Sequence, residues 1–200
     1  MSGARSPWDS AYIGSPPPWD IGRPQPAVIR LADSGAFRGR VLDAGCGTGE
    51  NALEIASRGL PTWGIDGAPR AIAKARAKAA QRVPIAAAAT FLVADALELE
   101  HLGLQFETIL DCGLFHTFDD EERARYVGNL AAVLTAGGRL HLLCFSDLEP
   151  GGWGPRRITR AEIEAAFAGG WRIAALERER FATRFADGGA HAWLATVERA

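Results

Sequence analysis

A glycine-rich turn between a short apolar strand and a helix constrains the fold of this 200-residue chain more than any other feature. Residues 41–44 are predicted to form the strand, residues 45–49 hold three glycines, and residues 50–58 are predicted to form the helix. Glycine lets a ligand approach the backbone where a side chain would block it, and a helix N-terminus offers unpaired N–H groups to a polar or anionic group. The pattern therefore predicts a βα unit that binds a ligand at its turn; a tight turn without a ligand is the alternative.

The alternation of strand and helix continues along the chain. Further helices are predicted at 27–35, 69–81, 120–135 and 159–167, and further strands at 61–65, 90–94, 106–112 and 139–145. Short apolar strands are typical of a parallel sheet with helices on both faces. Two longer strand-like runs follow at 171–181 and 190–198, joined by the hairpin signal Asp187-Gly188-Gly189. The sequence predicts an α/β fold with three layers, αβα, around a seven-stranded, mostly parallel sheet that ends in an antiparallel β-hairpin.

The first 26 residues differ from the rest in composition. They contain six prolines, which exclude a regular helix, together with Trp8, Tyr12 and Trp19. A disordered tail rarely carries so many aromatic side chains. We therefore expect an ordered arm at 1–26 and a single folded domain at 27–200, in keeping with the length of the chain.

Charge and cysteine content narrow the class of protein. The net charge of −2 argues against nucleic acid as a partner, because its binding usually needs a basic face. The cysteines are Cys46, Cys112 and Cys144, an odd number without metal-site spacing, which indicates free thiols in a reducing compartment. No signal-peptide core or apolar run of membrane-spanning length is seen. We expect a soluble cytoplasmic protein without a metal site.

Three acidic residues follow three successive predicted strands. Asp43 ends the first strand, Asp66 the second, and Asp95 comes directly after the third. Ligands of open α/β sheets bind at the carboxyl ends of the strands, so these carboxylates are expected along one crevice. Asp66 is placed to accept hydrogen bonds from the hydroxyls of a ribose, with an N-cap role as the alternative. Asp95, with the backbone N–H of Ala96, is placed to contact an adenine ring.

The spacing of the glycines bears on which nucleoside is bound. A dinucleotide-binding turn needs G-x-G-x-x-G/A directly after the strand. Counted from Gly45, the third position is Glu50; counted from Gly47, Ala52 fits, but the turn begins two residues late. An NAD(P)-dependent oxidoreductase is therefore disfavoured but stays as an alternative. The buried carboxylate expected at Asp43 suits a cationic ligand such as S-adenosylmethionine (SAM), which carries an ammonium and a sulfonium.

Residues 41–50 resemble the first motif of the class I SAM-dependent methyltransferases, and the resemblance extends from about residue 18 to the end of the chain. It implies a Rossmann-like fold, which the final hairpin distinguishes from the dinucleotide-binding fold. It also implies SAM as the cofactor, with its methionine part on the glycine turn, its ribose on Asp66 and its adenine on Asp95 and Ala96. The cofactor-binding candidates are Trp19, Asp43, Gly45, Cys46, Gly47, Gly49, Asp66, Gly67, Ala68, Asp95, Ala96, Asp111 and Cys112.

The arm narrows the resemblance further. Residues 17–26 are similar to a segment of the small-molecule branch that contains the thiopurine, thiol and halide methyltransferases, with relatives that methylate heterocyclic toxins. This implies that the arm folds over the cofactor and the acceptor. Trp19 would then face the sulfonium through a cation–π contact, or else only anchor the arm. The loop that carries Trp153 also resembles this branch, in which it helps to roof the pocket.

The segment after the fourth strand is where class I enzymes bring the acceptor to the methyl group. His116 is the candidate catalytic residue, as a general base, because the pKa of imidazole lies near neutrality; an orienting histidine is the alternative. Phe115 and Trp153 are further acceptor-site candidates, together with His116. Asp111 either contacts the cofactor or caps its own loop.

The predicted function is methyl transfer by direct displacement to a small-molecule O, N, S or halide acceptor, of aromatic or heterocyclic character. The predicted partners are that acceptor and no nucleic acid or membrane, with the chain as a monomer or weak homodimer. Besides the oxidoreductase, a non-catalytic SAM-binding module is an open alternative. An RNA methyltransferase is disfavoured by the mildly acidic charge.

Overall fold

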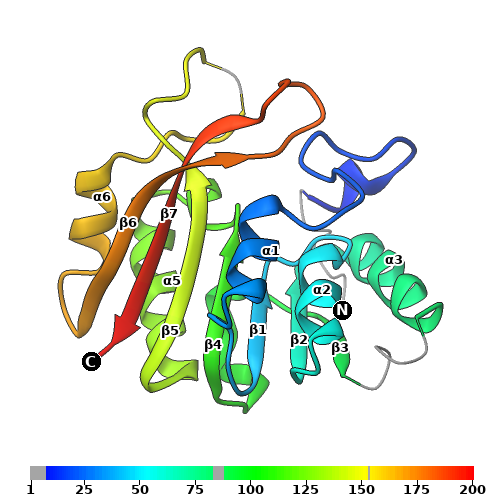
Figure 1. The fold of residues 1–200 in the computed structure, drawn as a ribbon, viewed down its shortest axis with the longest axis horizontal. Helices are drawn as coiled ribbons and strands as arrows, with labels where there is room; N and C mark the ends of the chain where they lie inside the picture. Colours follow the sequence, from blue (N-terminus) through cyan, green and yellow to red (C-terminus); the bar gives the residue numbers. More distant parts are fainter. Residues whose placement is uncertain (1–7, 83–87, 153) are drawn as a thin grey trace.

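One seven-stranded sheet runs through the molecule, in a computed structural model that describes residues 8–82, 88–152 and 154–200 (Figure 1). The strands are β1 (Val41–Ala44), β2 (Thr62–Asp66), β3 (Ala89–Val93), β4 (Phe106–Cys112), β5 (Leu134–Phe145), β6 (Trp171–Phe181) and β7 (Ala190–Arg199). Their order is β3-β2-β1-β4-β5-β7-β6. The first five strands are parallel, and β7 is antiparallel to both β5 and β6. The predicted sheet and C-terminal hairpin are confirmed.

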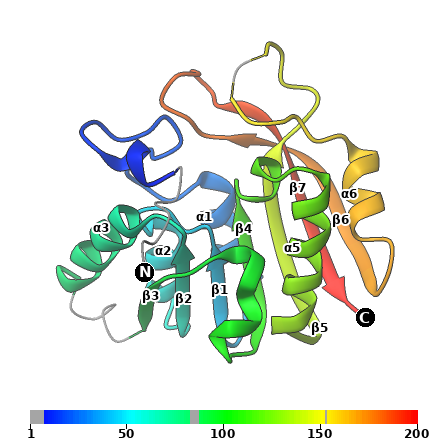
Figure 2. The ribbon, with the colours of Figure 1, turned by 180° about the vertical axis from the view of Figure 1, so that it is seen from behind.

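Helices cover both faces of the sheet and make the three layers. On the face toward the viewer in Figure 1 lie α1 (Pro26–Asp33), α2 (Glu50–Ser57) and α3 (Pro69–Ala80). The opposite face, seen in Figure 2, carries α5 (Asp120–Val133), α6 (Arg160–Ala166) and the 3₁₀ segment η2 (Ala96–Leu102). The main apolar core lies under α5 and α6, and smaller clusters lie under α1, α2 and α3. Short, mainly apolar strands are what a parallel sheet covered by helices on both faces requires.

The start of β5 differs from the prediction. The glycine pair Gly137-Gly138 was expected to end the helix, with the strand only beginning at 139. The helix instead ends at Val133, and Leu134 already pairs with Phe106 in the sheet. The register then shifts, and Gly137 adopts a φ of +69° in this irregular stretch. The glycines therefore permit a bulge inside β5, a common role of glycine in strands.

Strands β1 to β5 all end at the same edge of the sheet, here called the carboxyl edge. Ala44 of β1 lies beside Ile65 of β2 and Asp111 of β4, so the turns after these strands are neighbours. The arm, the β5–α6 loop and the β6–β7 loop all gather above this edge, at the top of Figure 1. Segments distant in the sequence thus converge where ligands of such sheets bind.

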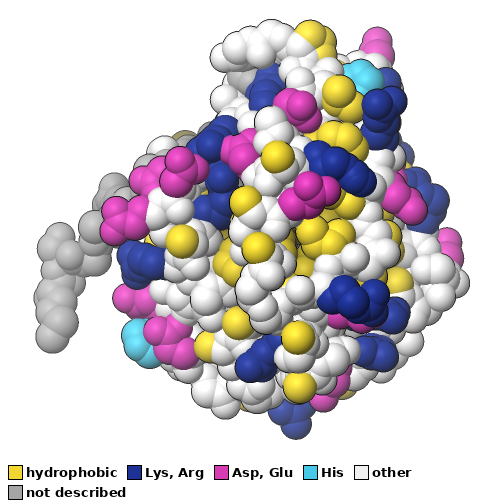
Figure 3. Space-filling view, turned by 90° about the vertical axis from the view of Figure 1, so that its left-hand side faces the viewer, with side chains coloured by type: hydrophobic (Ala, Val, Ile, Leu, Met, Phe, Trp, Pro, Cys, Tyr) yellow, Lys and Arg dark blue, Asp and Glu magenta, His cyan; other side chains and the backbone are white. Residues whose placement is uncertain are grey.

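Strand β6 forms the outer edge of the sheet. Its side chains include charges of both signs, Arg172, Glu177, Arg178, Glu179 and Arg180. Figure 3 shows that side of the molecule, where charged side chains surround a smaller group of apolar ones. Charges along an edge strand discourage pairing with another sheet. In the part of the chain that the structure describes, no helix has the length and hydropathy needed to cross a membrane.

Candidate active site

The turn after β1 has the geometry of a ligand cradle. Gly45, Gly47 and Gly49 have φ values of +72°, +54° and +85°, in the left-handed region that other residues rarely adopt. A Cβ added at Gly45 would lie 3.0 Å from the Cβ of Leu114, at the end of β4. A side chain here would therefore crowd Leu114, and the close approach of the two strand ends favours glycine at this position.

Asp43 lies directly below this turn, fully buried. Neither carboxylate oxygen has a hydrogen-bond partner of good geometry among the described residues. Burial is the main cause that raises the pKa of Asp43 to about 8, the charge of Asp111 adds to it, and the nearby N–H of Ala52 offsets part of it. A buried carboxylate without a partner is costly unless a cation or a donor compensates it. This orphaned acid and the glycine cradle fit a ligand with a cationic amino-acid end, which SAM has.

Asp66 and Asp95 continue the row of acids along the carboxyl edge. Asp66 accepts the N–H groups of Gly47 (2.9 Å) and Ala68 (2.8 Å), and its pKa is raised, mainly by burial. Each carboxylate oxygen has a second lone pair, so both remain able to accept ribose hydroxyls. Asp95 is exposed, and its Oδ1 accepts the N–H of Leu97 (2.9 Å) as the N-cap of η2. Gly67, between these acids in the sequence, is exposed, and Ala96 is buried.

Four other cofactor-site candidates are less accessible than expected. Cys46 is buried in the apolar cluster formed by residues of α2, α3 and β3. Ala68 is fully buried under Tyr12 of the arm. Cys112 is half-buried and packs in the clusters on the α1 side of the sheet. The fourth candidate is Asp111, which is also fully buried.

Asp111 caps the turn that follows β4 rather than facing the crevice. It is fully buried, and it accepts the N–H groups of Leu114 (2.9 Å) and Phe115 and the hydroxyl of Tyr126 (2.9 Å). Burial raises its pKa to about 6, against the effect of these donors. Of the two predicted roles for Asp111, the structure supports the cap. The cap forms the one-turn η3 (Phe115–Thr117), which the sequence analysis did not predict.

The same turn directs the side chain of Phe115 into the main apolar core. The ring of Phe115 is fully buried and stacks on Phe167 at a centroid distance of 5.9 Å, with the guanidinium of Arg123 5.0 Å from its centre. Phe115 therefore packs in the core on the α5–α6 side, and its role as an acceptor contact stays a prediction. Trp153 lies outside the described residues, so its predicted role has no structural test.

His116 lies on the acceptor side of the same turn, only 4% exposed. Its Nδ1 accepts the backbone N–H of Phe145 at 2.9 Å. A backbone N–H is always a donor, so Nδ1 carries no proton and the neutral ring carries its proton on Nε2. Burial, with the positive charge of Arg157, lowers the pKa of His116 to about 3. In this arrangement the ring has no free lone pair with which to act as the predicted general base.

An aromatic cluster around His116 was not identified from the sequence. Phe145 ends β5 and Phe181 ends β6, with ring centroids 4.8 and 6.2 Å from His116. Both rings are largely buried, with 3% and 4% of the residue exposed. A Cβ at Gly113, the residue after β4, would lie 3.0 Å from the ring of Phe181. The guanidinium of Arg157 lies 5.6 Å from the centre of Phe145. The available signal was positional, because both phenylalanines are the last residues of their strands.

The arm closes one side of the carboxyl edge. Tyr12, in the 3₁₀ turn η1 (Asp9–Tyr12), is buried against Ala68 and Ala71, and its hydroxyl would lie 3.2 Å from a Cβ at Gly47. Trp19 is 40% exposed and its Nε1 donates to the Tyr12 hydroxyl at 3.4 Å. From the sequence, Tyr12 was identified only as an aromatic residue of the arm, and its position beside the glycine turn was not predicted.

Several hydrogen bonds tie the arm to the rest of the site. Asp20 accepts the hydroxyl of Thr48 in the glycine turn at 2.9 Å. The side chain of Gln25 is buried and pairs twice with the backbone of Ala182, at 2.9 Å for each hydrogen bond. Arg184 donates its backbone N–H to Pro18 at 2.9 Å and its side chain to the carbonyl of Asp20. The arm thus bridges the glycine turn and the start of the β6–β7 loop.

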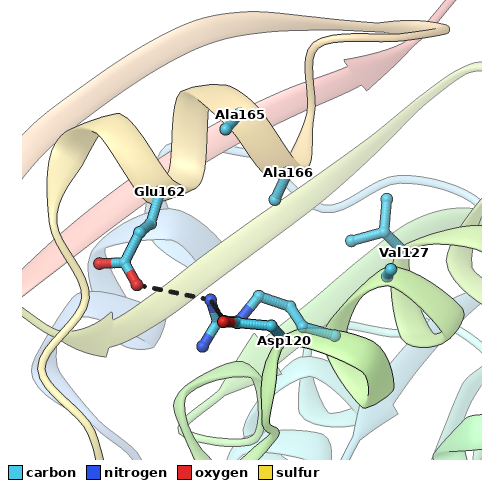
Figure 4. A pocket seen from close by; sticks show the side chains of 7 residues that line it. Asp120, Val127, Glu162, Ala165 and Ala166 are labelled. Carbon is cyan, nitrogen blue, oxygen red and sulfur yellow. Dashed lines mark hydrogen bonds and ion pairs between the residues drawn. The ribbon is translucent and has the colours of Figure 1, made fainter.

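A separate hollow of about 420 Å³ lies between α5 and α6 (Figure 4). It is lined by Asp120, Arg123, Ala124, Val127, Glu162, Ala165 and Ala166. Arg123 and Glu162 pair across it at 3.6 Å. None of the predicted site residues lines it, so it is distinct from the carboxyl-edge site.

Comparison with known proteins agrees with this geometry. Residues 41–138 match a family model described as a methyltransferase domain. A 2-heptyl-1-hydroxyquinolin-4(1H)-one methyltransferase of Mycobacteroides abscessus is 34% identical over 183 residues, which cover 89% of this chain and 80% of that protein. A solved structure reported as "Conversion of a Disulfide Bond into a Thioacetal Group during Echinomycin Biosynthesis" is 34% identical, with a TM-score of 0.84 over 96% of this chain and 88% of that one.

A third similarity shows the fold alone. The magnesium protoporphyrin IX methyltransferase of Synechocystis PCC 6803, solved with bound SAM, is 23% identical and has a TM-score of 0.68 over 87% of this chain and 76% of that one. The glycine cradle, the orphaned Asp43 and the row of acids provide the donor and acceptor groups that SAM requires. The chain belongs to the class I SAM-dependent methyltransferases, an enzyme family whose methyl donor is S-adenosylmethionine, and it resembles most clearly members that act on small molecules.

Proposed function

We propose that this enzyme methylates a flat, apolar small molecule held between the glycine turn and the cluster of His116, Phe145 and Phe181. The observation that carries the proposal is the position of this cluster. It lies directly beyond Gly113, and Gly113 adjoins Leu114, whose side chain lies close to Gly45 of the glycine turn. Aromatic side chains offer a flat acceptor offset-stacked or edge-to-face contacts. The hydroxyquinolinone named for the relative from M. abscessus is a flat heterocycle of this kind.

SAM, when bound, supplies an electrophilic methyl group on a positively charged sulfur. The residues of this chain then have three tasks. Asp66 and Asp95 would hold the nucleoside, and the glycine turn above Asp43 would hold the amino-acid end. The aromatic cluster would orient the acceptor toward the methyl carbon and exclude water, because alignment and dehydration account for much of the acceleration in direct displacements.

We assign the lid to residues 1–26 and the catalytic domain to residues 27–200. The contacts of Asp20 with Thr48, and of Gln25 with Ala182, support this division, because they join the arm to both sides of the crevice. Trp19 keeps 40% of its surface exposed beside Tyr12, which suits a side chain that packs further when a ligand is present. Its cation–π contact with the sulfonium remains part of this proposal.

The acceptor class is tested by a screen of thiols, halides, phenols and N-heterocycles, read out as S-adenosylhomocysteine formed. We expect turnover to be fastest with aromatic and heterocyclic members. The variant Phe181→Ala should raise KM for these acceptors without changing affinity for SAM, and Phe185→Ala, on the exposed loop beyond it, is the matched control. Efficient turnover of halides alone, or equal effects of the two variants, would contradict the proposal.

We further propose that the enzyme acts on free small molecules in the cytoplasm, as a monomer or weak homodimer, and not on nucleic acid. The net charge of −2 and the mixed charges along β6 support this. Light scattering of the purified protein over a concentration series tests the oligomeric state. A stable higher oligomer, or methylation of RNA, would contradict it.

A further inference from the structure

The hydrogen bond between Phe145 and His116 fixes more than the orientation of the ring. Because Nδ1 accepts the N–H of Phe145 at 2.9 Å, the single proton of the neutral imidazole lies on Nε2. Nε2 makes no hydrogen bond with a described residue, yet it is not among the fully enclosed unpaired polar atoms in those segments. The small exposed part of this ring is therefore consistent with an Nε2–H that a molecule in the crevice can reach.

We propose that His116 is a hydrogen-bond donor to the acceptor rather than its base, and that the enzyme selects acceptors which have already lost their proton. This inference rests on the proposed function, since it concerns the acceptor held by the aromatic cluster. The Nε2–H would hold the negatively charged nucleophilic atom in place. The class of acceptor is then an acidic one, such as an aromatic thiol or an N-hydroxy or hydroxy heterocycle that ionises near neutral pH.

The chemistry balances without a base. A lone pair of the acceptor anion forms the new bond to the methyl carbon, and the bond from that carbon to sulfur breaks. Its electron pair stays on sulfur, which leaves as a neutral thioether, so no proton has to be removed. The electrostatic surroundings agree, because the charged group that acts on His116 is the cation of Arg157, which favours a neutral ring and an anion nearby.

Two substitutions separate the donor from the anchor. In His116→Asn the amide oxygen can take the place of Nδ1 and keep the bond to Phe145, but the donor is lost. In His116→Gln the amide N–H₂ reaches the place of Nε2 and keeps the donor, but the N–H of Phe145 loses its partner. We expect His116→Asn to remain as stable as wild type and to lose roughly 10- to 100-fold in kcat/KM, the effect of one hydrogen bond to a charged group.

The opposite pattern is expected of His116→Gln. Its kcat/KM should fall at least several-fold less than that of His116→Asn, because the donor remains, while its unfolding temperature falls by roughly 2 to 8 °C because a buried N–H is left unpaired. Ring-substituted thiophenols and phenols of graded acidity are the acceptors. The apparent pKa of kcat/KM should follow the acidity of the acceptor in wild type and in His116→Gln. If His116→Asn keeps the activity, or if the pH profile shows a pKa that ignores the acceptor and vanishes in His116→Gln, the proposal is wrong.

A measurement without an acceptor keeps this inference distinct from the proposed acceptor class. Nitrogen-15 NMR of histidine-labelled protein, with His116 assigned by its loss in the Gln variant, reports the tautomer directly. We expect the Nε2–H form, without titration from about pH 5 to about pH 8. A ring that protonates in this range, or that carries its proton on Nδ1, overturns the donor role even if aromatic acceptors are methylated. Failure of all aromatic acceptors, with this tautomer present, refutes the acceptor class and the selection of acidic acceptors, but not the donor geometry.

Discussion

Among single residues, the acids of the carboxyl edge differ in what compensates their charge. Asp43 has a pKa of about 8 in the folded protein, against about 4 in an unfolded chain. Because the folded-state pKa is the higher one, stability from the protonated carboxyl is present at low pH and is lost as the pH rises from about 4 to about 8. Asp111, with a pKa of about 6, contributes in the same direction. Both effects describe the protein without a cationic ligand.

Replacing Asp43 by asparagine tests this pH dependence. Asp43→Asn keeps the shape of the side chain and removes its charge. Its free energy of unfolding relative to wild type should therefore increase as the pH rises from about 5 to about 8, by roughly 1 kcal/mol or more. Urea denaturation at several pH values measures the difference. Asp187→Asn, in the exposed β6–β7 loop, should show a difference that does not change with pH. A constant difference for Asp43→Asn as well would mean that Asp43 is already compensated.

Asp66 has a second function besides its proposed contact with ribose. Its carboxylate holds the N–H of Gly47 and so stabilises the turn itself. Asp66→Ala removes both interactions, and we expect the affinity for S-adenosylhomocysteine to fall roughly 10- to 1000-fold, as for two hydrogen bonds to a charged group. Isothermal titration calorimetry gives the dissociation constant. Asp33→Ala, at the exposed end of α1, should leave it unchanged. Unaltered affinity in Asp66→Ala would remove the ribose assignment.

At the scale of elements, the sequence was informative where local patterns decide the structure. The hairpin and the parallel strands, apart from the start of β5, lie close to their predicted positions, because each depends on local periodicity or on a turn signal. The bulge at Gly137 and the η3 turn were not predicted, although a cap of its own loop was one of the two roles predicted for Asp111. Both depend on a partner strand or on a side chain several residues away, which a linear pattern does not show.

The candidate site divides in the same way. The glycine turn and the acids after the strands were found because a ligand-binding edge follows from strand order alone. The burial of Phe115 was not expected, because the η3 turn, not the strand, sets the direction of its ring. Phe145, Phe181 and Tyr12 were not assigned to the site, since only tertiary contacts bring three distant segments to one crevice.

The arm is the element whose attachment is most open to test. The buried amide of Gln25 forms a strand-like pair of hydrogen bonds with the backbone of Ala182. In Gln25→Ala, both backbone groups of Ala182 lose these partners. Loss of each costs roughly 1 to 3 kcal/mol locally, so the arm should open more often. Limited proteolysis should then cleave within residues 13–25 at least several-fold faster than in wild type. Arg23→Ala, an exposed position of the same arm, is the control. Equal cleavage rates would show that other contacts hold the arm.

On the scale of the whole molecule, two halves of the sheet meet at the crevice. Strands β1, β2 and β3 are followed by the glycine turn and the acids. The aromatic cluster comes from the ends of β5 and β6 and from the turn after β4. The arm is the connection between these halves outside the sheet. A nucleoside bound on the first half therefore has a physical route to the acceptor half through Asp20, Thr48, Gln25 and Ala182.

This connection predicts coupled protection against hydrogen exchange. Saturating S-adenosylhomocysteine stabilises the folded protein by RT ln(1 + [L]/Kd), about 2.7 kcal/mol at a hundredfold excess over Kd. Amide exchange should therefore slow together in the glycine turn (45–49), the arm (17–25) and the β6–β7 loop (182–189), while the outer helix α6 changes less. In Gln25→Ala the glycine turn should stay protected by the ligand, and the β6–β7 loop should lose most of its gain. If the loop is protected equally in both proteins, the effect of the ligand is transmitted to the loop by other contacts. If NAD gives the same protection as S-adenosylhomocysteine, the nucleoside specificity assigned to this edge is wrong.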